Sequence, residues 1–172
     1  MATIIILLGE HDSGKSKTIK QFMGMSGKKN NATRLFSISG KCVPVFVRKQ
    51  SSPQECHRKN DPKGIADIKE RLTKCKKLAK ELGLSDFILL LPFSMLRSKG
   101  AFNETAILDG IELLKNENEV FVIHFKNNTT KYFEEVNEFV ESRIRAFATI
   151  KSNEEYKEQA KELEILIKLT KI

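Results

Sequence analysis

Eight residues near the N-terminus have the types and spacing of a phosphate-binding loop. Gly9 and Gly14 enclose four other residues, and Lys15 and Ser16 follow directly, which matches the pattern G-x-x-x-x-G-K-[ST] at every position. The glycines permit backbone angles that a side chain would forbid, so successive N–H groups can turn inward and form a cup for anionic oxygens. A helix that starts here adds unpaired N–H groups and the positive end of its dipole. The pattern therefore predicts a polyphosphate site.

Lys15 and Ser16 are expected to carry separate parts of this chemistry. The Lys15 ammonium can reach the β- and γ-phosphates of a nucleotide, which makes Lys15 the first expected catalytic residue, and the Ser16 hydroxyl can join the octahedral shell of Mg²⁺. The expected cofactors are therefore ATP, or another nucleoside triphosphate, and Mg²⁺. The residues expected to bind them are Gly9, Glu10, His11, Asp12, Ser13, Gly14, Lys15 and Ser16, with Ser16 as the metal ligand.

This loop resembles the Walker A motif of the P-loop NTPase superfamily. The resemblance covers a strand, a loop and a helix from about Ile4 to Phe22, and more loosely the alternation of strands and helices in the rest of the chain. It implies a P-loop NTPase-like α/β fold, in which a parallel sheet is flanked by helices. The segment from His11 to Ser16 is also similar to the loop of translation-factor GTPases. That group also has a D-x-x-G element after a strand and an N-K-x-D element. Asp109-Gly110 does not supply the first spacing and lies in an expected helix, and N-K-x-D is absent, so the base is left unassigned, with adenine as the default.

The superfamily usually has a second signature, an apolar strand that ends in an acid near the Mg²⁺. Here Ser94 stands where that acid is expected, and the other candidate strand ends in His124-Phe125-Lys126. Three explanations are open: Ser94 serves as a neutral ligand, an acid comes from elsewhere in the chain, or turnover is slow or absent. The acids considered are Glu10, Asp12, Glu55 and Asp109.

Two arginines are candidates for neutralising charge during phosphoryl transfer. Such transfer depends on positioning and electrostatics, so a nearby guanidinium matters. Arg97 lies just past the end of an expected strand, where ligands of open α/β sheets gather, and is the second expected catalytic residue. Arg58, in a basic stretch, is the next candidate. A plain surface role is the alternative for both.

Two functions are open. The first is a small Mg²⁺-dependent kinase or NTPase that acts on an unknown acceptor. The second is a non-catalytic or slow nucleotide-dependent module, in which the nucleotide orders the polar, basic stretch from Lys49 to Lys63 and changes the affinity for a protein partner or nucleic acid. That stretch is equally well interpreted as a connector. The complete phosphate loop favours the enzyme, and the missing strand-end acid favours the module.

Short apolar runs alternate with helical segments along the chain. Thr3–Leu8, Phe87–Leu91 and Val120–Phe125 are typical of strands buried on both faces of a parallel sheet, and Ala146–Ile150 is a weaker fourth candidate. Residues 34–48 predict a β-hairpin at one edge of the sheet. Because Pro44 cannot donate to a ladder, its strand is expected at the edge or with an irregularity.

Helices are expected between these strands. Asp61, Pro62 and Gly83 mark the start and stop of one, and its apolar stripe contains Ile65, Ile68, Leu72, Cys75, Leu78, Ala79 and Leu82. Further helices are expected over about 103–115 and about 130–142. A last helix starts with a capping box of Ser152 and Glu155, and its buried face is Tyr156, Ala160, Leu163 and Ile167.

Length, charge and cysteines restrict the class of protein. The 172 residues support one hydrophobic core, so residues 1–172 are expected to form a single domain. The net charge of +8 is dispersed, which is typical of a solvated lysine-rich surface, with nucleic-acid contact as the alternative. No apolar run is long enough for a membrane helix, and no secretion signal is evident. Cys42, Cys56 and Cys75 have no zinc or disulfide spacing, so reduced thiols in a cytoplasmic protein are expected.

Overall fold

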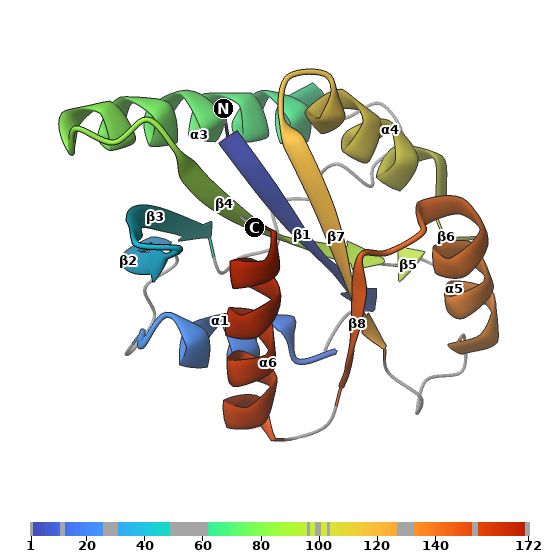
Figure 1. Cartoon of the computed structure of the whole chain (residues 1–172). Coiled ribbons are helices and arrows are strands. Elements are labelled where there is room, and N and C mark those ends of the chain that lie inside the picture. The colour runs from blue at the N-terminus through green and yellow to red at the C-terminus, as the bar shows by residue number, and fades with distance from the viewer. Residues whose placement is uncertain are drawn as a thin grey trace.

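A six-stranded sheet forms the centre of the computed structural model, and helices cover both of its faces (Figure 1). The described residues are 2–10, 13–25, 31–48, 62–95, 97–98, 101–102, 104–126, 133–152 and 155–170. The strands of the sheet are β1 (Ala2–Glu10), β2 (Asn31–Ile38), β3 (Lys41–Arg48), β4 (Phe87–Met95), β7 (Glu119–Lys126) and β8 (Ala148–Lys151). The short strands β5 (Arg97–Ser98) and β6 (Ala101–Phe102) pair separately. The helices are α1 (Lys15–Phe22), α3 (Pro62–Glu81), α4 (Glu104–Lys115), α5 (Phe133–Phe139), the π-helical turn η1 (Val140–Ile144) and α6 (Tyr156–Leu169). The expected α/β class is confirmed.

Strand β1 lies in the middle of the sheet, between β4 and β7. The strand order is β2-β3-β4-β1-β7-β8, and every described pairing in it is parallel except the β2–β3 hairpin. The parallel pairing of β7 with β8 confirms the expected fourth strand. The chain places β4 on one side of β1 and β7 on the other, so the strand order reverses at β1. Ligands of open α/β sheets bind outside the carboxyl ends of the strands at such a point.

Burial on both faces explains the uninterrupted apolar sequence of β1, in which residues 2–9 are buried. Ile4, Ile6 and Leu8 belong to the core under α3, α4 and α5, whereas Ile5 and Leu7 belong to the core under α1 and α6. Figure 1 shows these two helical layers on opposite sides of the sheet. A strand covered by helices on both faces has no polar side, so its sequence does not alternate.

The β2–β3 hairpin occupies one edge of the sheet, as expected, but Pro44 does not lie in the edge strand. Ser39 and Gly40 form the turn with positive φ angles of 51° and 76°. The edge strand is β2, and Pro44 lies in β3, which also pairs with β4. Of the two alternatives expected for the strand of Pro44, an edge position or an irregularity, the edge position is therefore wrong. Strand β3 accommodates the proline because its pairing with β4 covers only Val45 to Val47, after Pro44.

Helix α3 has its expected limits but a narrower buried face than expected. Pro62 is its first residue, and Gly83 follows it with a φ of 71°. The buried stripe consists of Ile68, Leu72, Cys75 and Ala79. Leu78 and Leu82, expected on that stripe, are 45% and 54% exposed. Leu78 lies to one side of the stripe, and Leu82 follows the last helical residue. Asp61 lies outside the described residues.

The helical segment expected over about 130–142 is α5 followed by η1, which extends it to Ile144. Arg145 then ends the segment with a φ of 52°, and its backbone N–H bonds to the carbonyl of Val140. Helix α6 begins at Tyr156, and its residues Ala160, Leu163 and Ile167 are buried against the sheet, as expected. No described helix has the length and apolarity needed to cross a membrane.

The capping box expected at the start of the last helix is absent. Glu155 is the N-cap of α6, and no side-chain hydrogen bond caps the helix there. The Ser152 hydroxyl instead donates a hydrogen bond of 2.6 Å to the backbone carbonyl of Ser13, after β1. The prediction failed because the helix begins at Tyr156 with Glu155 as its N-cap, so Ser152 does not occupy the capping position.

Candidate functional site

Gly9, at the end of β1, is a point of close approach between strands. It pairs with Ser94 of β4 and Phe125 of β7. A Cβ atom on Gly9 would lie 2.8 Å from the carbonyl oxygen of Phe125 and 2.9 Å from Oγ of Ser13. Gly9 is not among the glycines with positive φ, so the expectation of a forbidden backbone angle is wrong here. Its role is to leave room for the neighbouring backbone and for Ser13.

Gly14 provides the turn into α1. Its φ of 84° lies in the left-handed region, as the motif predicts for a glycine, and it is the N-cap of the helix. The first turn of α1 contains no acidic residue, and no side chain caps it. The positive end of the helix dipole therefore meets no carboxylate from that turn.

The Lys15 ammonium is buried inside the loop, and the residue is only 4% exposed. Its Nζ atom donates hydrogen bonds of 2.8 Å to the carbonyl oxygen of Gly9, 2.6 Å to that of Glu10 and 2.8 Å to Oγ of Ser13. These three neutral oxygens orient the ammonium without cancelling its charge. A phosphate oxygen that approaches Lys15 must therefore replace at least one of them, since an ammonium has three N–H donors.

Glu10 and Ser16 bring further oxygen atoms to the loop. Ser16 is half-buried in the first turn of α1. The Oε1 atom of Glu10 is buried and has no hydrogen-bond partner among the described residues. A carboxylate oxygen buried without a partner is costly, and Mg²⁺ binds carboxylate, hydroxyl and water oxygens. Each of the two side chains thus offers an oxygen of a kind that Mg²⁺ accepts, although the described residues contain no cluster of three or more His, Cys, Asp or Glu suited to a metal.

Side chains of helix α6 and of the residue after β8 form hydrogen bonds with the loop and with α1. Besides the bond from Ser152 to Ser13, the Thr18 hydroxyl donates a hydrogen bond of 2.7 Å to Oε1 of Gln159, and Nε2 of Gln159 donates one of 3.2 Å to the carbonyl of Lys151. Thr18 and Gln159 are both buried. The sequence analysis missed the bonds from Ser152 to Ser13 and from Thr18 to Gln159, because their partners are 139 and 141 residues apart and no local pattern links them.

The remaining expected site residues divide into two groups. Ser94 pairs with Gly9, so its backbone lies where the resemblance requires an acid, and Arg97 begins β5 shortly after β4 ends. Asp109 is an exposed residue of α4. His11, Asp12, Glu55 and Arg58 lie outside the described residues. The structure thus brings together Gly9, Glu10, Ser13, Gly14, Lys15 and Ser16, and a role for Arg97 stays a prediction.

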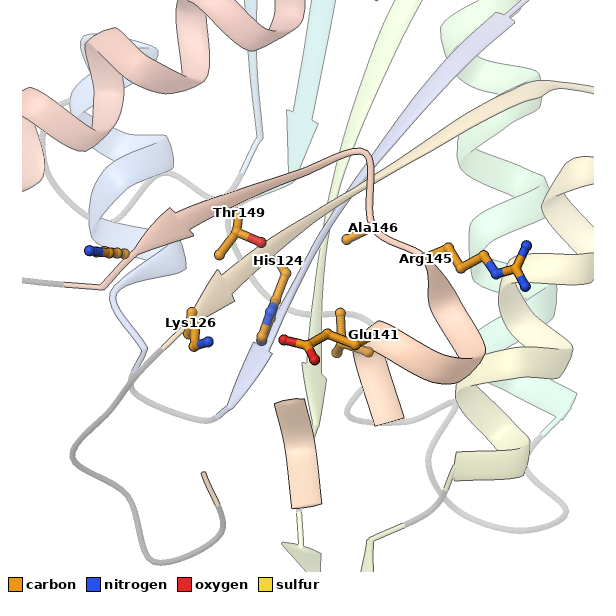
Figure 2. A pocket seen from close by; sticks show the side chains of 8 residues that line it. His124, Lys126, Glu141, Arg145, Ala146 and Thr149 are labelled. Atoms are coloured by element: carbon orange, nitrogen blue, oxygen red, sulfur yellow. The ribbon is translucent and has the colours of Figure 1, made fainter. Parts of the chain in front are cut away.

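His124 is a buried residue close to this loop that the motif did not reveal. It lies on β7, pairs with Leu8 of β1, and is 3% exposed. Burial and the positive charges of Lys126 and Lys15 lower the pKa of His124 to about 4. The imidazole is therefore neutral at pH 7. Its side chain lines a pocket between β7, β8 and η1 (Figure 2).

The low pKa of His124 predicts a loss of stability on acidification. An unfolded histidine takes up a proton near pH 6.5, whereas the folded one resists protonation until about pH 4. The unfolded state therefore binds more protons between these values, and stability falls as the pH falls from 6.5 to 4. Between pH 7 and pH 5 we expect His124 to account for a loss of about 2 kcal/mol in the free energy of unfolding.

Urea denaturation at pH 7 and pH 5 measures this effect. The decrease in the free energy of unfolding from pH 7 to pH 5 should be smaller in His124→Gln than in the unmodified protein, by about 2 kcal/mol. Comparing each protein with itself removes any general effect of the substitution. Equal losses in both proteins would contradict a neutral, buried His124.

The backbone of Gly9 and Glu10 and the Ser13 hydroxyl thus surround a buried ammonium at the amino end of a helix. No protein-family model and no curated protein matches the chain. The class of this protein is therefore inferred from its residues and their geometry.

Proposed function

We propose that this protein is a Mg²⁺-dependent nucleoside triphosphate-binding protein of the P-loop NTPase type that acts as a small NTPase or phosphotransferase, with ATP as the expected nucleotide. The observation that carries the proposal is the position of the Lys15 ammonium. It is buried at the amino end of α1 and held by the carbonyls of Gly9 and Glu10 and by the Ser13 hydroxyl. A fixed cation at the positive end of a helix dipole suits the β- and γ-phosphates of a nucleotide.

Lys15, Ser16, Glu10 and the backbone after Gly14 have separate roles in this proposal. Lys15 gives up part of its contact with the loop and bonds to phosphate oxygens, and the backbone N–H groups after Gly14 hold the remaining oxygens. Ser16 and Glu10 are the residues that would hold Mg²⁺. When bound, that ion neutralises charge on the β- and γ-phosphates. Glu10 thus supplies the acid that Ser94 does not, and its buried Oε1 atom supports this assignment.

A second candidate function is a nucleotide-dependent interaction module with slow or no turnover, whose partner is another protein or nucleic acid. The observation in its favour is that a serine, Ser94, pairs with Gly9 at the strand end.

For both candidates we propose a reducing, cytoplasmic environment, since Cys42 and Cys75 are free thiols.

Calorimetric titration with MgATP, followed by ³¹P NMR of the mixture, tests the proposal. We expect saturable binding of MgATP that is weaker when EDTA removes Mg²⁺. Release of inorganic phosphate would identify an NTPase, a new phosphomonoester in the presence of hydroxyl compounds would identify a kinase, and binding without turnover would identify the module. Absence of binding by ATP and by the other nucleoside triphosphates would refute the proposal.

A further inference from the structure

A pocket of about 670 Å³ opens where β7 and β8 end, on the side of the sheet that η1 covers (Figure 2). Two side chains from each strand line it, and the strand register pairs them. His124 lies beside Thr149, and Lys126 lies beside Lys151. Side chains at neighbouring positions of parallel strands project from the same face, so these four groups form one wall. The volume is in the range of sites for small molecules.

The wall of the pocket is cationic at its outer end. Lys126 and Lys151 occupy paired positions on neighbouring strands, and both line the pocket, so two ammonium-bearing side chains extend from this wall. Figure 2 shows that the guanidinium of Arg145, although it belongs to a lining residue, points away from the other labelled side chains. The two lysines are therefore the cations suited to an anionic ligand.

The inner end of the pocket is polar and can bind a hydroxyl group. The neutral imidazole of His124 and the hydroxyl of Thr149 line it, and Figure 2 shows the carboxylate of Glu141, from η1, directed toward His124. A neutral imidazole both donates and accepts a hydrogen bond, and a carboxylate accepts one. A ligand hydroxyl can therefore be oriented here.

The inner end also lies close to the phosphate loop. Lys15 is one of the charges that lower the pKa of His124, and His124 pairs with Leu8, the residue before Gly9. The ammonium proposed to bind the γ-phosphate therefore acts on the inner wall of this pocket.

We propose that this pocket binds the acceptor of the phosphoryl transfer, a small molecule that carries a hydroxyl group and an anionic group, either phosphate or carboxylate. Lys126 and Lys151 bind the anionic group, and His124, Thr149 and Glu141 orient the hydroxyl. This inference rests on the proposed function. The acceptor oxygen bonds to the γ-phosphorus, the bond from that phosphorus to the β,γ-bridging oxygen breaks, and the nucleoside diphosphate leaves with the electron pair. The hydroxyl proton passes to the Glu141 carboxylate and then to water.

The imidazole signals of His124 provide a direct test, because the chain has three histidines and His124→Gln identifies one set of signals. The probes are glycerol 3-phosphate, glycerate and glycerol, which share hydroxyl groups and differ in the anionic group. We expect a saturable shift of the His124 signals with glycerol 3-phosphate, glycerate or both, and none with glycerol at the same concentration. The anion that binds more tightly identifies the acceptor class. No saturable shift with either anion, or an equal shift with glycerol, would overturn the inference.

Two variants locate the bound anion. Replacing both lysines, Lys126→Gln with Lys151→Gln, should raise the dissociation constant of the anion by about tenfold or more, since two charge-assisted contacts are lost. Lys15→Ala, which removes the cation of the phosphate loop, should leave the saturable response of His124 in place. An unchanged dissociation constant in the double variant, or loss of the response only in Lys15→Ala, would place the anion in the loop and refute the pocket.

MgATP titrations of the same samples separate this inference from the proposed function. If nucleotide binds but neither anion shifts the His124 signals, the pocket inference fails and the proposed function stands. If an anion binds in the pocket but no nucleoside triphosphate binds, the proposed function fails, and with it the role of the pocket as an acceptor site.

Discussion

Lys15→Ala is expected to weaken MgATP binding by at least about 100-fold, because it removes charge-assisted hydrogen bonds to the phosphates. The Lys15 ammonium is held at the amino end of α1 by the carbonyls of Gly9 and Glu10 and by the Ser13 hydroxyl. Its position is thus set before the nucleotide arrives, so binding does not have to immobilise a free side chain. Calorimetric titration of both proteins with MgATP measures the change.

Lys17→Ala is the matched control. Lys17 lies two residues further along α1 and is exposed, and its Nζ atom lies 3.3 Å from the Tyr156 hydroxyl. Removing it changes the net charge by the same amount, so a general loss of electrostatic attraction would affect both variants equally. We expect Lys17→Ala to bind MgATP nearly as tightly as the unmodified protein. Undiminished binding by Lys15→Ala, with its circular dichroism spectrum unchanged, would show that the nucleotide binds elsewhere.

The strand, loop and helix at the N-terminus are predictable from the sequence because each is encoded locally. An apolar run of strand length, two glycines at a fixed separation and a helix after the second glycine require no knowledge of the rest of the chain. Gly14 illustrates this, since its φ of 84° is a conformation that a glycine adopts readily. The buried strands β4 and β7 are predictable for the same reason.

The surroundings of the loop are not encoded locally, and the sequence analysis missed them. The Ser152 hydroxyl donates to the carbonyl of Ser13, and it does not cap α6 because that helix begins at Tyr156 with Glu155 as its N-cap. His124 stands at the end of an apolar strand, and its low pKa arises from burial and from charges on two separate elements. The pairing of Lys126 with Lys151 depends on the register of β7 and β8, which neither strand specifies alone.

Gly9→Ala is expected to lower the free energy of unfolding by about 2 kcal/mol or more, since overpacking a well-packed site has this cost. The added Cβ would lie 2.8 Å from the carbonyl oxygen of Phe125, 3.0 Å from its Cβ and 2.9 Å from Oγ of Ser13. Two of these atoms belong to the neighbouring strand β7, so either β1 and β7 separate or the loop shifts. A shift of Ser13 also moves a hydrogen-bond acceptor of the Lys15 ammonium, so MgATP affinity should fall with stability. Urea denaturation and calorimetric titration measure the two effects.

Gly110→Ala is the matched control, because it makes the same chemical change at another buried glycine. We expect it to raise the free energy of unfolding or to change it little. Gly110 is a buried residue of α4, and a Cβ atom there would meet its nearest neighbours, Cε2 and Cζ of Phe93, at 3.5 and 3.9 Å. These are ordinary contact distances, and alanine is a better helix former than glycine by up to about 1 kcal/mol. A Gly9→Ala protein as stable as Gly110→Ala would show that β1 and β7 do not approach closely at the loop. The position assigned to the Lys15 ammonium would then be wrong. The Gly9 carbonyl and the Ser13 hydroxyl hold that ammonium, and both lie where β1 and β7 approach each other closely.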